Sequence, residues 1–335
     1  MAVLLPFQAF RSSNPTIHIP GEEPRPVAEK AKYRQDAKPG LFHYRQRFRF
    51  PGDPADSVRD GIMGLLDRTA ATIFPHEQTT PGRVYECRRM LESSGGDPGS
   101  LWLWCDDPDA VLLALLETTS SPEIEIEDRF GCLHQIWTLA DVDRIRAIQS
   151  ALQGKCLFLA DGHHRYAAGW DLGTIQIRSQ ALRTLASHRV VLDATDVCLP
   201  ASQPLGDIDS YLATPAPGCS RCVVVTPGPV FRGIPVFRGI EVPSGIHIQK
   251  LLHNATVQPV RGLSAAIHAV GSGKAAMALL LPPFTLEQIE WGASRGILLP
   301  PKSTDFYPKL AAGLVVHRPQ NENVTPPVAQ RPGVR

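Results

Sequence analysis

The sequence predicts an α/β protein of the α+β kind, with mixed sheets and flanking helices. Short apolar runs predict strands, and capped segments with one apolar face predict helices between them. The chain has 335 residues, 43% of them hydrophobic, which is enough for two or three subdomains. We expect a divergent N-terminal segment, an α/β core, a smaller C-terminal α/β subdomain and a disordered tail, over residues 1–50, 51–200, 201–317 and 318–335.

Residues 1 to about 40 are rich in proline and charge and show little periodicity. Aromatic and basic residues alternate over 41–50, which predicts a strand. Ser57 can cap a helix, and a second helix is expected from Val84 to about Ser93. The apolar face of the first helix would hold Val58, Ile62, Leu65 and Leu66.

The middle of the chain carries clearer signals. Residues 101–105 predict a strand, and Asp109 is expected to cap a short helix through Leu116. Residues 123–128 and 132–139 predict a hairpin. Asp141 can cap a helix that runs to Leu152 and leads into the next apolar run.

The last third has fewer signals. We expect a helix over 246–252, a strand over 275–281, and a helix capped by Thr285 with Gln288 as its capping-box partner. The hexapeptide Pro-Val-Phe-Arg-Gly-Ile occurs twice in tandem over 229–240. Two copies are too few for a solenoid, so the repeat indicates a local duplication whose role the sequence does not assign.

Composition narrows the functional classes. Net charge is +1, from 34 basic and 33 acidic residues, which disfavours nucleic acid as a partner. The seven cysteines are an odd number and several lie in apolar runs, which suits reduced thiols in a cytoplasm. No apolar stretch approaches membrane-spanning length and no signal peptide is recognisable, so we expect a cytoplasmic protein. The oligomeric state cannot be read from the sequence.

One segment indicates chemistry rather than packing. The apolar run 156–160 predicts a buried strand, and Asp161-Gly162-His163-His164-Arg165 follows it directly, at the expected start of a helix. A helix N-terminus favours an anion, and Gly162 lets a ligand approach the backbone closely. Cationic side chains oppose the helix dipole there, so a bound phosphate explains them better. Asp161 is then a candidate base or Mg²⁺ ligand. The alternative is a plain turn in which Asp161 caps the helix and both histidines are solvated.

A second polar cluster lies near the C-terminus. Lys302, Ser303, Thr304 and Lys309 occur together in a turn-rich stretch, where two lysines and two hydroxyls can hold a phosphate group. A solvated surface turn is the alternative. His188 and Arg189 form another small basic pair before a β-branched run, and are secondary candidates.

Three segments together resemble one family. They are Phe74-Pro-His-Glu-Gln-Thr79, Leu159-Ala-Asp-Gly-His-His-Arg-Tyr166, and Pro300-Pro-Lys-Ser-Thr-Asp-Phe-Tyr-Pro-Lys-Leu310 with Gly313-Leu-Val315. Their order and spacing resemble the prokaryotic family catalogued as domain of unknown function 1015, from about Leu41 to Val316. The chain departs from that family after Pro6-Phe7, where a divergent, shortened stretch replaces its usual Ala-Pro-Pro-Tyr-Asp-like segment.

A more distant resemblance implies an activity. His76-Glu77 before a helix, followed later by Asp161-Gly-His-His-Arg165, is similar to the partition-protein and sulfiredoxin superfamily. This resemblance implies that fold for the core and nucleotide-phosphate binding at the second motif. Some members phosphorylate free serine with a glutamate and an aspartate, which match Glu77 and Asp161. Sulfiredoxin chemistry is disfavoured because His163 stands where those proteins need a cysteine.

These features predict a nucleotide-dependent phosphotransferase acting on a small hydroxylated metabolite, with ATP or ADP and Mg²⁺ as cofactors. The residues from Gly162 to Arg165 would hold the nucleotide phosphates, and Lys302 and Lys309 would offset charge on the transferred group. Glu77 or Asp161 would accept the hydroxyl proton while the other binds Mg²⁺. His76 and Thr79, in the loop of Glu77, are secondary candidates.

Three alternatives stay open. The shortened N-terminus allows a regulator that binds a nucleotide or phosphorylated metabolite without turnover. A nucleic-acid-binding module like the partition proteins is disfavoured by the near-neutral charge. A metal hydrolase using His76, Glu77, His163 and His164 receives less weight, because adjacent histidines at a helix start rarely face one metal ion.

Overall fold

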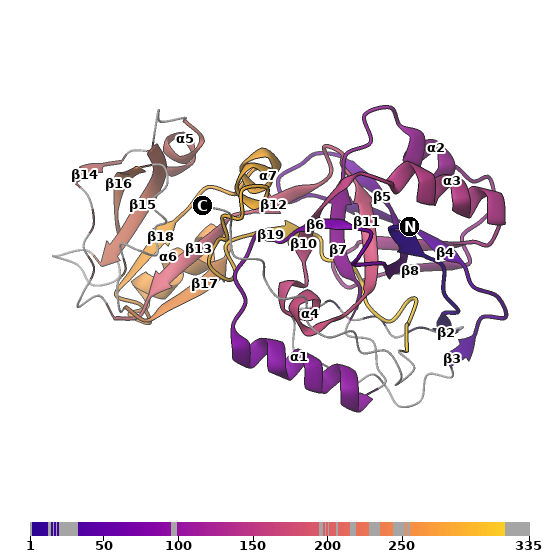
Figure 1. Ribbon diagram of the computed structural model, residues 1–335. Coiled ribbons are helices and arrows are strands. Elements are labelled where there is room, and N and C mark those ends of the chain that lie inside the picture. The colour runs from indigo at the N-terminus through magenta and orange to yellow at the C-terminus, as the bar shows by residue number, and fades with distance from the viewer. Residues whose placement is uncertain are drawn as a thin grey trace. The chain divides into compact units, whose positions relative to one another are not determined.

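The computed structural model describes residues 2–12, 15, 17, 19, 33–94, 99–193, 197, 199, 201–205, 207–214, 219–227, 235–243, 252 and 255–318. The chain divides into two compact units (Figure 1). The first comprises Met1–Arg183, Glu290–Leu298 and Phe306–Arg335, and the second comprises Thr184–Ile289 and Leu299–Asp305. Each unit combines strands and helices, which confirms the predicted α/β class.

The first unit contains most of the secondary structure. Its strands are β1 (Leu4–Leu5), β2 (Phe10–Ser12), β3 (Tyr33–Gln35), β4 (Leu41–Arg49), β5 (Asp56–Leu66), β6 (Thr72–Phe74), β7 (Leu101–Cys105), β8 (Ile124–Glu127), β9 (Leu133–Leu139), β10 (Cys156–Asp161) and β11 (Leu172–Ile177). Its helices are α1 (Pro81–Ser94), α2 (Val111–Leu116), α3 (Val142–Leu152) and α4 (His163–Ala168). Among the described helices, none combines the length and apolar character needed to cross a membrane.

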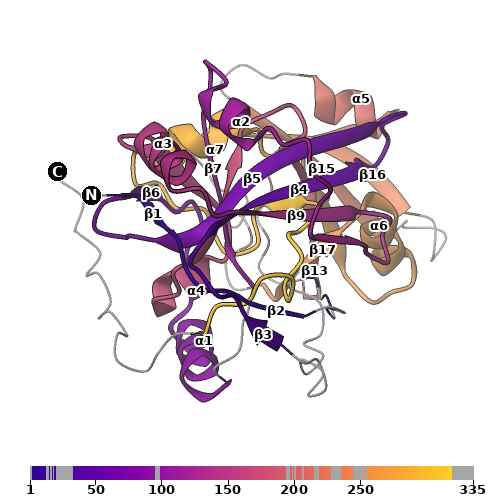
Figure 2. The same cartoon turned by 90° about the vertical axis from the view of Figure 1, so that its right-hand side faces the viewer.

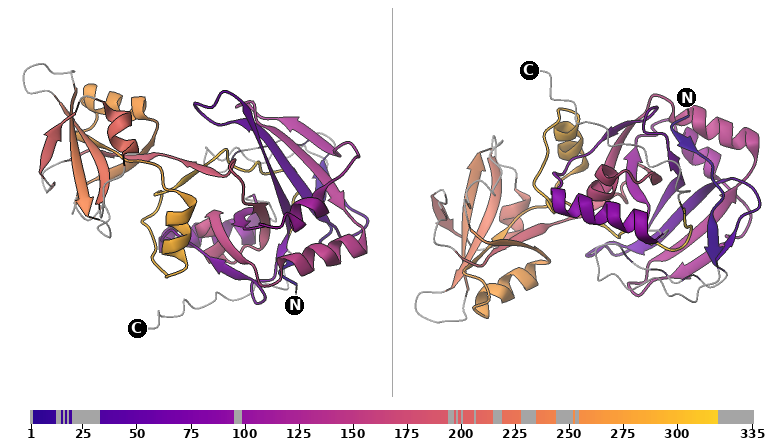
Figure 3. Two further views of the ribbon diagram at one scale, coloured as in Figure 1. Left: turned by 90° about the horizontal axis from the view of Figure 1, so that it is seen from above. Right: turned by 60° about the horizontal axis from the view of Figure 1, so that its bottom comes forward.

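A nine-stranded mixed sheet organises the first unit. Its strand order is β6-β10-β7-β11-β5-β4-β9-β8, with β1 added beside β5. Two pairs, β6 with β10 and β7 with β11, are parallel, and the other pairs are antiparallel. Figure 2 shows β5, β4 and β9 as long adjacent strands. Helix α1 packs beside α4 (Figure 3), and α2 packs beside α3.

The helix expected after Ser57 is wrong, because residues 56–66 form the central strand β5. This strand pairs with β4 on one side and β11 on the other, so neighbouring strands satisfy its backbone groups. Two glycines make the close packing possible. A Cβ at Gly64 would lie 2.7 Å from Leu41 Cδ2, and one at Gly61 would lie 3.1 Å from the Ile175 carbonyl oxygen. Of the apolar residues that suggested a helical face, Ile62 and Leu66 are buried in the strand, whereas Val58 is 41% exposed.

Several local predictions of the first unit are confirmed. Strands form at 41–49, 101–105 and 156–161, and the expected hairpin is made by β8 and β9. Helix α1 covers the second expected helix. The cap assigned to Asp109 is wrong: Ala110 occupies the N-cap position of α2, and no side chain caps it there.

The capping of α3 by Asp141 is confirmed and supports a prediction. The Asp141 carboxylate accepts a hydrogen bond of 2.7 Å from the Arg144 backbone N–H. We expect Asp141→Ala to lower the free energy of unfolding by about 1 kcal/mol, because a helix N–H loses its acceptor. Asp143→Ala, which removes an exposed acid from the same helix turn, is the matched control and should cost less. Urea denaturation of both variants measures the difference, and equal losses would contradict the capping role.

The second unit has its own sheet of six strands in the order β14-β16-β15-β18-β13-β17. Helix α6 packs against this sheet and closes an apolar core around Val223, Val225 and Leu280. The elements are β13 (Ser187–Val191), β14 (Ser202–Pro204), α5 (Ile208–Ala213), β15 (Cys219–Pro227), β16 (Pro235–Pro243), β17 (Val257–Arg261), α6 (Leu263–Gly271) and β18 (Met277–Leu280).

Three further elements, β12 (Arg183–Leu185), α7 (Leu286–Ala293) and β19 (Asp305–Tyr307), contain residues of both units. The capping box at α7 is confirmed: Thr285 N donates to Gln288 Oε1 and Gln288 N donates to Thr285 Oγ1. The second hexapeptide copy, 235–240, lies in β16, whereas the whole first copy, 229–234, lies outside the described residues. The tail from residue 319 and most of the helix expected over 246–252 also lie outside them.

Candidate functional site

Sheet topology brings the first two motifs together. Strands β6 and β10 are adjacent and parallel, so the segments that follow them leave the sheet at the same edge. The loop after β6 carries His76 and Glu77, and β10 ends at Asp161, from which α4 begins. The ends of parallel neighbouring strands are a recurrent place for ligand-binding residues.

The histidines of the second motif bind the backbone of the first. The His76 backbone N–H donates to His163 Nε2 at 3.3 Å, and the Thr80 N–H donates to His164 Nε2 at the same distance. The His76 and His163 rings also meet edge to face, 4.5 Å between centroids. Because Nε2 accepts in both histidines, a neutral ring carries its proton on Nδ1. The two motifs therefore hold each other in place.

Burial keeps two of these rings uncharged. Burial lowers the pKa of His76 to about 4, against an opposing effect of Glu77. Burial, with the neighbouring His76, lowers the pKa of His163 well below its ordinary value. Near neutral pH neither ring supplies positive charge, so any attraction of His163 for a phosphate would come from a neutral hydrogen-bond donor.

These neutral rings make stability depend on pH. The unfolded chain binds a proton at each histidine below about pH 6.5, whereas the folded chain resists it. The free energy of unfolding should therefore fall between about pH 6.5 and pH 4, by up to about 1.4 kcal/mol per pH unit for each histidine.

Urea denaturation at several pH values checks this expectation. In His163→Gln the amide oxygen can still accept the His76 N–H, but it does not titrate, so the pH dependence should become shallower. Other buried histidines contribute equally to both proteins. An unchanged slope in His163→Gln would contradict the assignment.

Asp161 lies between two cations. Its Oδ1 is 3.0 Å from Lys309 Nζ, and its Oδ2 is 3.0 Å from an Arg165 Nη atom. All three side chains are only partly exposed, at 27%, 15% and 11% for Asp161, Lys309 and Arg165. Partial burial strengthens such ion pairs relative to pairs in open solvent. The first unit thus brings Lys309 of the third motif to the aspartate of the second.

Arg165 also anchors the start of α4. Its guanidinium donates to the backbone carbonyls of Gly99 and Ser100, at 2.7 and 3.1 Å. Gly162 allows this arrangement, because its φ is +95° and a Cβ there would lie 3.1 Å from the guanidinium. Arg165 therefore holds the Asp161 turn against the segment before β7, in addition to any contact with a ligand.

Magnesium fits the two candidate carboxylates unequally. Both oxygens of Asp161 already lie 3.0 Å from cationic nitrogens, so a directly bound Mg²⁺ there would meet two like charges. Glu77, on the partly exposed loop after β6, is the other candidate carboxylate. Thr79 follows in the same loop and is also partly exposed.

The remaining candidates belong to the second unit. The Lys302 carbonyl accepts hydrogen bonds from Arg189 and from Ser187 Oγ, at 2.8 and 2.7 Å. Ser303 Oγ donates to the Pro300 carbonyl. His188 Nδ1 accepts the Leu281 N–H, and burial lowers the His188 pKa. Lys302, Ser303, Thr304, His188 and Arg189 thus lie in one unit, while Lys309 lies in the other with Asp161.

Sequence reasoning missed the side chains that support Lys309. Arg59 and Gln46 are both 1% exposed and hydrogen-bond to the chain around it. Arg59 lies in the stretch expected to be a helix. Only the recognition of 56–66 as a strand paired with 41–49 would have brought these two residues together.

Comparison with known proteins gives one family match and several distant structures. The family model described as "Protein of unknown function (DUF1015)" matches residues 26–197. A search of the curated proteins found no match.

The similar solved structures are remote in sequence. A free serine kinase in complex with AMP is 14% identical, with a TM-score of 0.43 over 73% of this chain and 86% of that chain. SbnI with a C-terminal truncation, from Staphylococcus aureus, is 11% identical, with a TM-score of 0.41 over 74% and 84%. A conserved hypothetical protein from Pyrococcus furiosus is 13% identical, with a TM-score of 0.38 over 76% and 95%. Because the family model spans more than half of the chain and includes the first two motifs, this protein belongs to the DUF1015 family.

Proposed function

We propose that this protein is a nucleotide-dependent phosphotransferase that acts on the hydroxyl group of a small metabolite. One observation carries the proposal: three motifs far apart in the sequence meet around Asp161. His163 and His164 hold the loop of Glu77, and Lys309 reaches Asp161 from 148 residues away. Phosphoryl transfer requires chiefly positioning and charge neutralisation, which a lysine and two carboxylates can provide.

The contacts support different roles for the two carboxylates. Asp161 forms ion pairs with the Lys309 ammonium and the Arg165 guanidinium, so its proposed role is to position these two cations. Glu77 is the proposed acceptor of the proton. The substrate oxygen would lose its proton to Glu77 and form a bond to the terminal phosphorus of ATP or ADP. The bond between that phosphorus and its bridging oxygen would break, and its electrons would leave with the nucleotide. Lys309 would offset the negative charge on the phosphoryl group during its transfer.

A direct assay tests this proposal. The protein is incubated with ATP or with ADP, Mg²⁺ and a pool of hydroxylated metabolites, and phosphorylated products are identified by mass spectrometry. Glu77→Gln should lose turnover by about 100-fold or more, since general base catalysis contributes that much. Glu86→Gln, an exposed carboxylate change on α1, is the matched control. Equal turnover by Glu77→Gln and the control would overturn the role of Glu77, and no product with any donor would overturn the activity.

A second candidate is a regulator that binds a nucleotide or phosphorylated metabolite without turnover. It is favoured by the engagement of both Asp161 oxygens with protein cations, which is also what a purely structural aspartate would show. Thermal stabilisation by a nucleotide without product formation would support it. The absence of any shift would count against both candidates.

A further inference from the structure

Among the described residues of the first unit, Arg59 is a buried cation without an acidic hydrogen-bond partner. Arg59 on β5 is 1% exposed, and within the described part of the chain its guanidinium donates only to uncharged oxygens. Its charge also lies over the rings of Trp102 and Phe48, at 4.4 and 4.8 Å. Burial lowers the Arg59 pKa to about 9. Burying a charge without an acidic partner is costly, and an apolar residue would avoid that cost. An arginine at this position is therefore better explained by the several hydrogen bonds that its guanidinium group donates.

The Arg59 guanidinium hydrogen-bonds to the backbone of the segment that carries Lys309. Arg59 donates to the Tyr307 carbonyl at 3.0 Å and to the Pro308 carbonyl. It also donates twice to Gln46 Oε1, at 3.0 and 2.7 Å, and Gln46 Nε2 donates to the Lys309 carbonyl at 3.1 Å. Gln46 and Arg59 face each other directly across β4 and β5. One cross-strand pair in the middle of the sheet thus holds three successive carbonyl groups.

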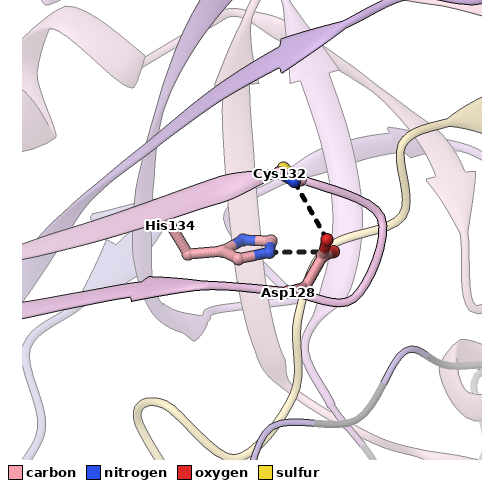
Figure 4. A group of neighbouring side chains, drawn as sticks. All are labelled: Asp128, Cys132 and His134. Carbon is pink, nitrogen blue, oxygen red and sulfur yellow. Dashed lines mark hydrogen bonds and ion pairs between the residues drawn. The ribbon is translucent and has the colours of Figure 1, made fainter.

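A second tether holds the other side of Lys309. The Ala311 N–H donates to the Tyr44 hydroxyl at 3.1 Å, and that hydroxyl lies 2.7 Å from His134 Nδ1. His134 Nε2 in turn lies 3.2 Å from Asp128, whose other oxygen accepts the Cys132 N–H (Figure 4). The assignment that satisfies every group has Tyr44 donating to Nδ1 and Nε2–H donating to Asp128.

Asp128, Cys132 and His134 are also residue types that bind metal ions. Their possible ligand atoms lie within 4.8 Å of one another. The hydrogen-bond chain explains it without a metal. Both His134 nitrogens and both Asp128 oxygens have hydrogen-bond partners in the described part of the chain. The trio therefore completes the second tether.

We propose that Arg59, through Gln46, is the positioning residue of this site: by fixing the backbone of 307–309, it holds the Lys309 ammonium at Asp161. A lysine side chain is flexible, and a displacement of about 1 Å in a reacting group can cost about 100-fold in rate. This inference rests on the proposed function for its kinetic consequence. Its structural consequence, the placement of Lys309, holds independently.

The first test therefore measures Lys309 itself. Trace acetylation of the full-length protein, read by peptide mass spectrometry, reports the reactivity of each lysine. In Arg59→Met we expect Lys309 to react at least about threefold faster, the size of a lost ion pair, while the reference Lys155 is unchanged. An unchanged Lys309 rate in folded Arg59→Met would overturn the inference, whether or not the protein is a phosphotransferase.

Gln46→Glu is a second variant, which tests the same inference if Arg59→Met does not fold. Glutamate keeps an acceptor for Arg59 and gives it an acidic partner, but it loses the donor to the Lys309 carbonyl. It should release Lys309 in the same assay. Thermal melting confirms that each variant is folded, and a Gln46→Glu protein with wild-type Lys309 reactivity would also overturn the inference.

Where turnover is measurable, a double-mutant cycle separates positioning from general damage. Arg59→Met should lower kcat by about 10- to 100-fold with little change in KM. In a Lys309→Met background the same change should alter kcat less than about twofold, because the group being positioned is gone. Full additivity of the two losses would show that Arg59 acts by another route.

Discussion

Replacing Lys309 with methionine is expected to lower kcat by about 100- to 1,000-fold, the range seen when one preorganised group that stabilises transition-state charge is removed. Methionine retains much of the apolar length of lysine and loses the ammonium group, which lies 3.0 Å from Asp161 Oδ1. The loss should appear in kcat more than in KM, because charge on the transferred phosphoryl group develops in the transition state. Steady-state kinetics with the substrate identified by the metabolite screen measures both parameters.

Lys155→Met is the matched control for this change. Lys155 lies in the same unit, where its ammonium donates to the Asp106 carbonyl and pairs with Asp107. The Lys155→Met variant thus loses similar contacts without altering the surroundings of Asp161, and its kcat should stay within about twofold of the wild type. Lys309→Arg should retain part of the activity, since it keeps the charge with different geometry. A Lys309→Met enzyme as active as the control would exclude Lys309 from catalysis.

The largest effect on stability is expected from Trp104→Ala, which should lower the free energy of unfolding by about 3–5 kcal/mol. Trp104 on β7 is fully buried, with its ring 5.3 Å from that of Phe158 and 5.2 Å from that of Phe306. Its indole N–H donates to Glu290 at 2.9 Å. Truncation removes these ring contacts and leaves a cavity beside Phe158 and Phe306.

Trp291→Ala provides a matched control on the surface. Its side chain is 57% exposed, and its main ring contact is with Arg295. We expect a change below about 1 kcal/mol for this variant. Urea denaturation followed by circular dichroism measures both proteins without relying on tryptophan fluorescence. Similar losses in the two variants would contradict the assignment of Trp104 to the core.

Features set by near neighbours in the chain were predictable. Asp141 caps α3, Thr285 and Gln288 form their capping box, and 156–161 forms a strand that ends at Asp161. The two caps depend on hydrogen bonds between residues three apart, and the apolar run 156–160 is itself a local strand signal. The same reasoning failed for 56–66, because its helical spacing was genuine but two neighbouring strands supplied better partners.

The candidate site shows the same division. The sequence by itself singled out the candidate residues, since Glu77, Asp161 and Lys309 stand out by residue type and motif order. Only the tertiary structure decided how they are arranged: the Lys309 ammonium lies 3.0 Å from Asp161, burial keeps His163 neutral, and Arg59 hydrogen-bonds the Tyr307 carbonyl, two residues before Lys309. The physical reason is that the histidine contact and the ion pair at Asp161 join segments more than 80 residues apart, and no local pattern encodes them.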